Sequence, residues 1–591
     1  MIPFGQRRYF GYAMGMKTAL IASVVLLCGC AHSPVTAVKP QGPTMDRSPR
    51  PLPKDVPTID LSQNNVATSW TVTPTIIDTR TFTNKRQLNG HVAGPYRRPA
   101  SLLPAHKNPD SPPPGPPNDL RSGLGQTETT IHDEGGFTAI VQTPWTPPDP
   151  SIAVGPNHVV VTVNMAIGFY DKNGNEQFSA NLDSTGNPGF FEAVGAGDFT
   201  FDPKCFYDPI AERFVVLALE QYGSTEAWIT MAVSDDDDPN GVWYKYRTWA
   251  VITVGGNTYW VDYPGFGFDD GYYYVTGNLF PMGGGGTSGA LYRVFDKTPM
   301  LVGDPVLISD VREGSHWSMQ GAQHHGDSPS AYFIGRKNST QLLVSRIDNP
   351  ANPSVSSNDV SVPSNSSPDY ISNPGGSLWA LDARIMNAQY RDGSLWTAHG
   401  VLGNGSNSVA RWYEIEVSDS GPPSLRQSGD VTLPFGVSSF FPAIAPNKRG
   451  EAAIVVAAAS SSQYPSVYIF GRTQGDTLGV MGTATQVVAG TSGADGRWGD
   501  YLDMTVDPIN DIRFWYVGEY QTGGGWNTYV GSAVITCVED VDASGTVNVS
   551  DLLALIASWG TDGAGAEISE PHDVIDVADL LGLIGSFGNC P

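Results

Sequence analysis

The sequence predicts a mainly β protein, a seven-bladed β-propeller followed by a small all-α module, and three observations lead to that prediction. One short motif recurs seven times between residues 130 and 536. Around these recurrences, β-branched and aromatic runs alternate with Gly, Pro, Asn and Asp, which is typical of strands joined by tight turns. Residues 537–591 instead contain two apolar stretches of helical length.

The recurring motif is a run of small and apolar residues, then a tight turn and a second strand. Asp149–Val154, for example, precedes Gly155-Pro156-Asn157 and the strand-like run Val159–Val163. A period of roughly 50–65 residues built only from strands and turns indicates one four-stranded sheet per propeller blade. Six or eight blades are the alternatives to seven. We expect Phe137–Gln142 to close the ring against Tyr529–Ile535. The other six occurrences begin at Phe201, Tyr263, Met319, Leu381, Phe441 and Leu502.

Length and charge exclude several classes of protein. A chain of 591 residues is too long for one ordinary domain. Its formal net charge of -25 argues against a nucleic-acid partner, because a phosphate binder needs a basic face. The same charge argues against docking on anionic lipid through a basic patch. We therefore expect contact with a membrane only through a lipid anchor.

The first 30 residues are predicted to be an export signal. Thr18–Leu27 is almost wholly apolar, long enough for a signal segment and too short for a membrane span. The following Leu27-Cys28-Gly29-Cys30 resembles a bacterial lipobox. That resemblance implies lipid attachment at Cys30 and a protein anchored to the cell envelope or cell surface. The alternative is an ordinary signal peptide and a secreted protein.

Residues 31–129 are predicted to be a disordered stalk, since they show no sustained strand or helix period. The run Ser111–Pro117 contains five prolines, which lack the amide donor and fix φ. Such a segment favours extended polyproline conformations and acts as a spacer.

Two segments within the propeller region resemble known propellers. Ser234–Trp243 is similar to the Asp-box turn of sialidase-like propellers, although two extra residues precede its Gly and one fewer follows it. In that family the box is a structural turn, so the resemblance concerns the fold. Gly496–Tyr501 is similar to a signature of uncharacterised secreted bacterial propellers.

The sequence assigns no catalytic residues. No Gly-x-Ser-x-Gly elbow, His-Glu-x-x-His motif or phosphate loop is present. A sialidase-type site needs an arginine clamp, a Tyr–Glu pair and an acidic Asp. Residues of these types occur in no arrangement that aligns with the family, namely Arg384, Arg391, Arg411, Arg497, Tyr501 and Glu519.

Trp498, with Arg497 and Asp500 beside it, is the predicted ligand surface. A Trp ring stacks well on sugar rings or peptides. The alternative is a core Trp at the junction of two blades.

The C-terminal region contains a predicted calcium loop. Asp540–Asp551 fits the twelve-residue pattern, with Gly545 at the sharp turn and oxygen-bearing residues at the ligand positions. The apolar run after this loop predicts a helix that ends at Gly560. The predicted ligands are Asp540, Asp542, Ser544, Thr546 through its carbonyl, Asn548 and Asp551.

A second loop-helix unit follows 28 residues later, and the pair resembles a type I dockerin. The second loop is degenerate, with Ile568 where the first ligand belongs and Asp573 where Gly belongs. We therefore expect one calcium site. The resemblance also implies a cohesin-like partner. Cys537 and Cys590 flank the module, and export permits a disulfide between them.

The leading hypothesis is a surface binding or adhesion protein whose propeller presents a recognition face to a glycan or a protein. The alternative is a glycan-active enzyme, a sialidase-like hydrolase or a polysaccharide lyase. A third hypothesis is a scaffold with no small ligand. Titratable residues that converge at the propeller axis favour the enzyme, whereas an axis lined by backbone, small residues and aromatics favours binding.

Overall fold

The computed structural model describes residues 56–82, the backbone of 96–97, and residues 129–186, 188–328, 330–403, 407–418, 421–536, 538–541, 546–561, 568 and 574–589. The predicted signal segment with Cys30 and most of the predicted stalk lie outside these residues. The same holds for Asp542, Ser544, Cys537 and Cys590.

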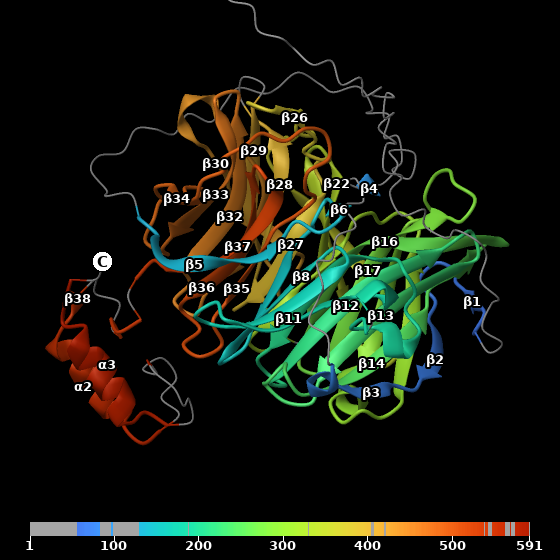
Figure 1. Ribbon diagram of the computed structural model, residues 1–591, viewed down its shortest axis with the longest axis horizontal. Coiled ribbons are helices and arrows are strands. Elements are labelled where there is room, and N and C mark those ends of the chain that lie inside the picture. The colour runs from blue at the N-terminus through green and yellow to red at the C-terminus, as the bar shows by residue number, and fades with distance from the viewer. Residues whose placement is uncertain are drawn as a thin grey trace, which may run out of the picture. The chain divides into compact units, whose positions relative to one another are not determined.

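The described residues fold mainly as β-sheet and form a β-propeller (Figure 1). Five blades are separate antiparallel sheets of four or five strands. In chain order, the first is β7 (Ser151–Val154), β8 (His158–Val163), β9 (Ala166–Asp171) and β10 (Glu176–Asn181). The second is β11 (Thr200–Asp208), β12 (Arg213–Tyr222), β13 (Glu226–Ser234) and β14 (Val242–Trp249), with β3 (Thr75–Asp78) added. The third is β20 (Gln320–Gly321), β22 (Ala331–Asn338), β23 (Gln341–Ile347) and β24 (Ser356–Ser361). The fourth is β31 (Ser438–Pro446), β32 (Ala452–Ser460), β33 (Gln463–Arg472) and β34 (Thr485–Val488). The fifth is β35 (Asp503–Val506), β36 (Phe514–Thr522), β37 (Gly525–Val534) and β5 (His132–Val141).

A twelve-stranded sheet contains two further antiparallel units of four strands each. Strand β21 (Gln323–His325) joins these two units, because it pairs in parallel with one strand of each, β16 (Asn257–Phe268) and β27 (Ile385–Arg391). One unit is β16 (Asn257–Phe268), β17 (Tyr272–Pro281), β18 (Ala290–Asp296) and β19 (Val306–Glu313). The other is β27 (Ile385–Arg391), β28 (Ser394–Leu402), β29 (Ser408–Glu416) and β30 (Ser424–Val431). The sheet also includes β1 (Ile59–Asp60), β2 (Thr68–Val72) and β15 (Ile252–Val254).

Short elements complete the described chain. The short helix α1 spans Lys297–Met300. Three two-stranded pairs are β25 (Ile371–Asn373) with β26 (Gly376–Leu378), β4 (Tyr96–Arg97) with β6 (Trp145–Thr146), and β38 (Thr546–Val547) with β39 (Gly588–Asn589).

The apolar core lies between successive sheets, because strands of one blade face those of the next. One cluster, for example, packs Phe169 of β9 against Val216 of β12 and Trp243 of β14. The Asp-box-like turn ends at this buried Trp243, whose Nε1 donates to Pro239 O at 2.8 Å. The turn therefore has the structural role that its resemblance implies.

An X-Pro step shapes the innermost strands of several blades. The ladder shifts register between Phe201 and Lys204, and the skipped residues are Asp202 and Pro203. Proline has no amide to donate to the ladder, so it is accommodated in a bulge. Asp202 adopts φ +45°, a left-handed conformation that turns the bulged strand locally. The same step recurs at Asp149-Pro150, Tyr263-Pro264 and Phe441-Pro442, with φ of +51°, +55° and +52° at the first residue.

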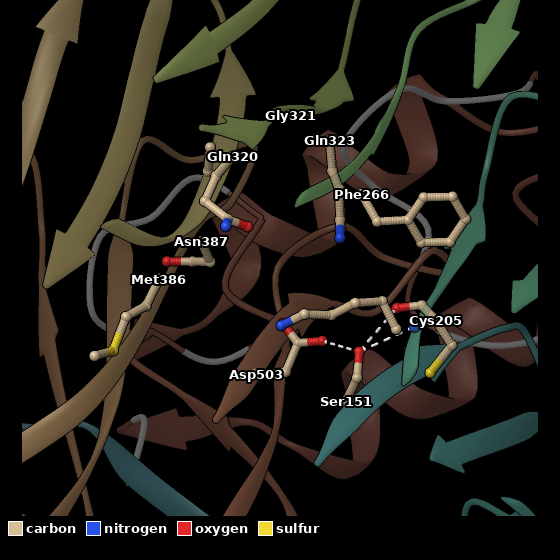
Figure 2. Close-up of a pocket in the computed structure, with 11 residues that line it drawn as sticks. Ser151, Cys205, Phe266, Gln320, Gly321, Gln323, Met386, Asn387 and Asp503 are labelled. Carbon is tan, nitrogen blue, oxygen red and sulfur yellow. Dashed lines mark hydrogen bonds between the residues drawn. The ribbon is translucent and has the colours of Figure 1, made fainter. Parts of the chain in front are cut away.

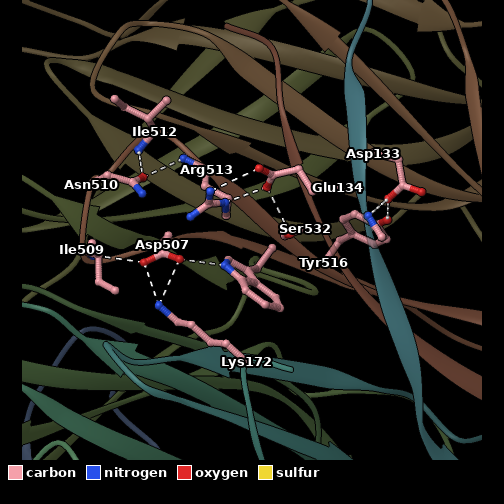
Figure 3. A network of polar contacts seen from close by, with 12 residues as sticks. Asp133, Glu134, Lys172, Asp507, Ile509, Asn510, Ile512, Arg513, Tyr516 and Ser532 are labelled. Carbon is pink, nitrogen blue, oxygen red and sulfur yellow. Dashed lines mark hydrogen bonds and ion pairs between the residues drawn. The ribbon is translucent and has the colours of Figure 1, made fainter. Parts of the chain in front are cut away.

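The ring closes where β5, which precedes the first blade in the sequence, pairs with β37 of the last blade. Strand β5 pairs with β37 in antiparallel register, with Phe137 opposite Val530 and Thr138 opposite Tyr529. This confirms the predicted closing pair. Figure 3 shows the polar side of this seam, where Arg513 contacts Glu134 and Lys172 contacts Asp507.

The structure differs from the predicted stalk over residues 56–82. Strand β3 pairs with the outer strand β14, and β2 pairs with the outer strand β19. Short strands of this kind need no core of their own, because an existing sheet edge supplies their hydrogen bonds. This part of the chain belongs to the propeller.

The C-terminal module contains the two predicted helices, α2 (Val549–Ala557) and α3 (Val577–Gly585). Each begins with a capping box, at Asn548 and at Asp576. Leu555 and Leu583 are buried in a small shared core. No helix among the described residues is long and apolar enough to cross a membrane.

Candidate active site

Titratable side chains converge where the innermost strands of several sheets meet. Tyr263 of β16 donates its hydroxyl to Ile385 O of β27 at 2.9 Å. Its ring lies 6.4 Å from that of Tyr501, just before β35. Tyr501 in turn donates to Pro203 O of β11 at 3.4 Å. Contacts among sheets this far apart in the sequence place these residues at the propeller axis. We use the name axial cluster for the titratable residues gathered there, which are Asp149, Asp202, Lys204, Tyr263, Arg384, Arg497, Asp500, Tyr501 and Glu519.

Asp149 is an enclosed acid in this cluster, with a fully buried side chain. Its Oδ1 accepts from the Asp500 amide at 3.0 Å, and its Oδ2 accepts from Asn164 Nδ2 at 2.7 Å. Burial raises the pKa of Asp149 well above its ordinary value, and the nearby carboxylates of Asp500 and Asp202 raise it further. These surroundings therefore favour the protonated form of Asp149.

Asp500 lies in a different environment from Asp149. The Arg497 guanidinium forms two hydrogen bonds with its carboxylate, with Nε at 3.1 Å from Oδ1. A bidentate contact between a guanidinium and a carboxylate is a strong charge-assisted pair. The cluster therefore places Asp149, an acid without a cation among its hydrogen-bond donors, next to Asp500, an acid paired with an arginine.

Two cations of the cluster lie over tyrosine rings. The Lys204 ammonium is 3.1 Å from the centre of the Tyr501 ring, and the Arg384 guanidinium is 4.4 Å from that of Tyr263. Burial lowers the pKa of Lys204 to about 8, against the opposing effect of nearby carboxylates. Burial also raises the pKa of both tyrosines. Their hydroxyls are therefore poor bases.

Glu519 of β36 is a fully buried acid in the cluster. Within the part of the chain that the structure describes, neither of its carboxyl oxygens has a hydrogen-bond partner. A Cβ added at Gly499 would lie 2.5 Å from Glu519 Oε2, so this acid packs directly against the segment that carries Asp500. Burial, with Asp149 and Asp500 nearby, raises the pKa of Glu519 well above its ordinary value.

A small cavity adjoins the cluster, between the inner strands (Figure 2). Lys204 and Asp503 line it together with the amides of Gln320, Gln323 and Asn387. Ser151 Oγ donates to Asp503 Oδ2 at 2.6 Å, as the dashed line in Figure 2 marks. The centre of a water-sized molecule can occupy about 20 Å³ of the cavity, which is room for roughly one water and not for a sugar ring.

Two segments beside the axial cluster are pinned to each other. The hairpin β25–β26 contacts the residues before Arg497 through Asn373, whose Nδ2 donates to Ala494 O at 2.8 Å. The Trp379 amide donates to Gly496 O at 2.9 Å. The Trp379 ring centre lies 5.8 Å from the Arg497 guanidinium, so a shift of this hairpin moves the partner of Asp500.

The three residues of the predicted ligand surface have two different roles. Arg497 and Asp500 pair with each other in the axial cluster. Trp498 is only 2 % exposed, and its Nε1 donates to Gln521 Oε1 at 2.9 Å. It packs in the core between blades, the alternative that the sequence left open.

The six residues compared with a sialidase-type site lie in different parts of the propeller. Arg384, Arg497, Tyr501 and Glu519 lie in the axial cluster. Arg391 instead pairs with Asp511, and Arg411 pairs with Asp430. Sequence reasoning did not select Asp149 or Asp202, although both occupy the first position of the recurring X-Pro step.

Within the described residues, no three His, Cys, Asp or Glu side chains form a group that could hold a metal ion.

No protein-family model matches the chain, and no curated protein sequence matches it. Solved structures similar to it include an exo-β-1,3-galactanase from Clostridium thermocellum, at 10% identity over 68% of this chain and 99% of that one, with a TM-score of 0.29. The NanB sialidase from Streptococcus pneumoniae is similar at 10% identity over 70% and 71%, with a TM-score of 0.32. An α-L-arabinanase from Penicillium chrysogenum is similar at 10% identity over 57% and 93%, with a TM-score of 0.26. At these scores the likenesses carry no inference about chemistry.

Proposed function

We propose that the propeller is a glycan-active hydrolase that works by acid–base catalysis at its axis. The observation that supports this most directly is the pairing of Asp149 with Asp500, two adjacent acids in different surroundings: burial raises the pKa of Asp149, and the Arg497 guanidinium pairs with the Asp500 carboxylate. Such a pair is what hydrolysis of a glycosidic bond requires. A purely binding or adhesive propeller gives no reason to enclose several like charges together.

The roles follow from the two environments. Asp149 is the general acid, and its proton goes to the glycosidic oxygen as the bond to the anomeric carbon breaks. Asp500 is the base, and it takes a proton from the water that attacks the anomeric carbon. Lyase chemistry has less support, because burial raises the pKa of Tyr263 and Tyr501 and so disfavours the phenolate form that would abstract a proton.

Access to the axial acids requires motion, since Asp149 and Asp500 are almost wholly enclosed. The hairpin β25–β26 is the element that we expect to move, because its contacts with residues 494–496 border the cluster.

We further propose that the propeller has seven blades. The units β16–β19 and β27–β30 each have the four-stranded antiparallel order of a blade, and they add to the five separate sheets. A parallel contact through β21 merges them into one sheet without changing that order.

The C-terminal module is proposed to bind calcium through its first loop. Asp540 and Asp551, the first and last ligands of the pattern, are both fully buried. Enclosed carboxylates of this kind fit a hard cation with oxygen ligands. A cohesin-like partner for the module, lipid attachment at Cys30 and display at the cell surface remain part of this proposal, and they rest on the sequence.

The decisive experiment is a hydrolysis assay on a panel of neutral and acidic polysaccharides, with release of new reducing ends as the readout. We expect the wild type to cleave at least one of them, and Asp149→Asn to be slower by about 10²–10⁴-fold. Asp359→Asn, an exposed acid on β24, is the matched control and should cleave at the wild-type rate. A panel on which the wild type and Asp149→Asn are equally inactive would return the propeller to the binding hypothesis.

A further inference from the structure

The chain that leaves the last blade is held by a side chain of the preceding blade. Arg449 lies in the turn between β31 and β32. Its Nη1 donates to Thr536 Oγ1 at 2.7 Å, and its Nη2 donates to Val538 O at 3.2 Å and to Asp540 O at 2.5 Å. Glu451 accepts from the same Thr536 hydroxyl at 2.6 Å. These bonds continue up to the first residue of the calcium-loop pattern.

An apolar contact lies beside these hydrogen bonds. Ile512 and Val534 of the closing blade form a small buried cluster with Val538. Ile568 of the C-terminal module packs against that cluster and also against the core of the module itself. Ile568 therefore connects two apolar regions that otherwise belong to separate parts of the chain.

Ile568 also occupies the position where a metal-binding loop needs its first carboxylate. Two described acids of that second loop contact backbone amides. Asp579 Oδ1 accepts from the Ile568 amide and its Oδ2 from the Asp576 amide, both at 2.9 Å. Asp576 Oδ1 accepts from the Ala578 amide. Ile568 is therefore tied to the start of α3 through Asp579 and to the closing blade through its apolar contact.

We propose that Ile568 docks the C-terminal module on the closing blade of the propeller as an apolar anchor, with Arg449 as the clamp on the connecting chain. On this account the loop exchanged a metal ligand for a contact within the same molecule. The module is then a fixed part of the propeller and not a freely hanging tag. The inference does not depend on the chemistry at the axis.

The position of the contact gives the docking a consequence for ring closure. Val534 ends β37, the strand that pairs with β5, and it lies opposite His132. A docked module therefore covers the end of the closing seam. Docking also leaves other apolar residues of the module outward, since Leu553 and Leu581 remain 61 % and 64 % exposed.

The test uses the full-length chain and three variants: Arg449→Ala, Ile568→Asp and, as the control, Leu581→Asp. Leu581→Asp introduces the same charge into the same module on its exposed side. The readouts are the rate of protease cleavage between residues 536 and 548, located by mass spectrometry, and the melting temperature of the propeller by tryptophan fluorescence.

We expect Arg449→Ala and Ile568→Asp each to raise the cleavage rate about tenfold, because cleavage follows the population of the opened form. Both should also lower the melting temperature by a few degrees, and Leu581→Asp should change neither readout. Because Arg449 lies outside the module, its replacement cannot unfold the module directly. If Ile568→Asp speeds cleavage and Arg449→Ala does not, or if both match Leu581→Asp, the docking proposal is wrong.

Discussion

The closing seam and the axis of the propeller both contain several acidic side chains, but the neighbours of these side chains differ between the two regions. At the seam each carboxylate meets its own donor (Figure 3). Asp507 accepts two hydrogen bonds from the Lys172 ammonium, both at 3.0 Å, and one from Trp515 Nε1 at 2.9 Å. Glu134 receives the Arg513 guanidinium in the same one-to-one way. At the axis, by contrast, Asp149 and Glu519 lie near other acids.

This difference distinguishes carboxylates that stabilise the fold from carboxylates that we propose take part in catalysis. A buried acid with a matched cation holds two strands together, and removing either partner is costly. A buried acid beside other acids lowers stability, so the fold tolerates it only where something else requires it. Substitutions at the seam and at the axis test this distinction.

Lys172→Met should destabilise the seam strongly. The substitution keeps the aliphatic stem but leaves the fully buried Asp507 without its cation. Loss of one partner of a buried pair costs about 3 kcal/mol, which urea unfolding followed by fluorescence can measure. Lys337→Met is the control, because the Lys337–Asp359 pair is exposed on both sides and is worth roughly 0–1 kcal/mol. Equal losses in the two variants would contradict a special role for the seam.

Arg497→Met should impair the proposed activity with a distinctive pH signature. Asp500 loses the guanidinium that holds its carboxylate in place, and we expect the rate to fall about a hundredfold. The positive charge of Arg497 also lowers the pKa of Asp149. Its removal raises that pKa, so the alkaline limb of the pH–rate profile moves to higher pH.

Arg411→Met is the control for that shift. Arg411 also pairs bidentately with an aspartate, Asp430, but within its own blade and away from the axis. An unshifted profile for Arg497→Met, or an equal shift for Arg411→Met, would remove Arg497 from the proposed mechanism.

The axial cluster could not be read from the sequence, whereas the blades largely could. Strand and turn signals are local, and each X-Pro step marks the start of an inner strand within a few residues. Asp149, Asp202 and Asp500 meet only because the ring closes, and no local pattern records that closure. Glu519 sits in the middle of an ordinary-looking strand, where only its burial reveals an unusual acid.

The strands of residues 56–82 escaped prediction for a related reason. Thr68–Val72 and Thr75–Asp78 contain β-branched and aromatic residues, but each is short and isolated within a polar, proline-rich region. Their partners β19 and β14 lie more than 150 residues away in the sequence. Trp498 is the converse case, since this conspicuous residue is buried in the core while its neighbours Arg497 and Asp500 belong to the axial cluster.

Glu519→Gln should make the protein more stable at alkaline pH than the wild type. The folded protein raises the pKa of Glu519 above its ordinary value of 4.5. The stabilising effect of that proton is present below the unfolded pKa and is lost as the pH rises toward the folded pKa. Each unit between the two pKa values is worth about 1.4 kcal/mol. Glutamine keeps the shape without the ionisation, so the variant gains stability relative to the wild type as the pH rises above 4.5.

Glu134→Gln at the seam is the matched comparison for Glu519→Gln. Glu134 is paired with Arg513, so its neutralisation removes an ion pair and should not stabilise the protein at any pH. Unfolding free energies measured in urea at pH 5 and pH 8 would decide between the two cases. A Glu519→Gln variant that loses stability at pH 8 would show that this acid has a hidden partner.

The calcium loop is a third group of acidic side chains, and there we propose that a cation from solution balances their charge. Asp540 and Asp551 are both buried, and a divalent ion would offset their repulsion as Arg513 offsets Glu134 at the seam. Asp540→Ala should therefore abolish calcium binding by the full-length protein in titration calorimetry, while the propeller melts as before. Asp576→Ala in the second loop removes a helix cap, which costs about 1 kcal/mol, and it should leave calcium binding in place. The expected stoichiometry is one ion per chain, because Ile568 offers no oxygen where the second loop needs its first ligand. Two equal sites, or an Asp576→Ala variant that loses as much binding heat as Asp540→Ala, would contradict this assignment.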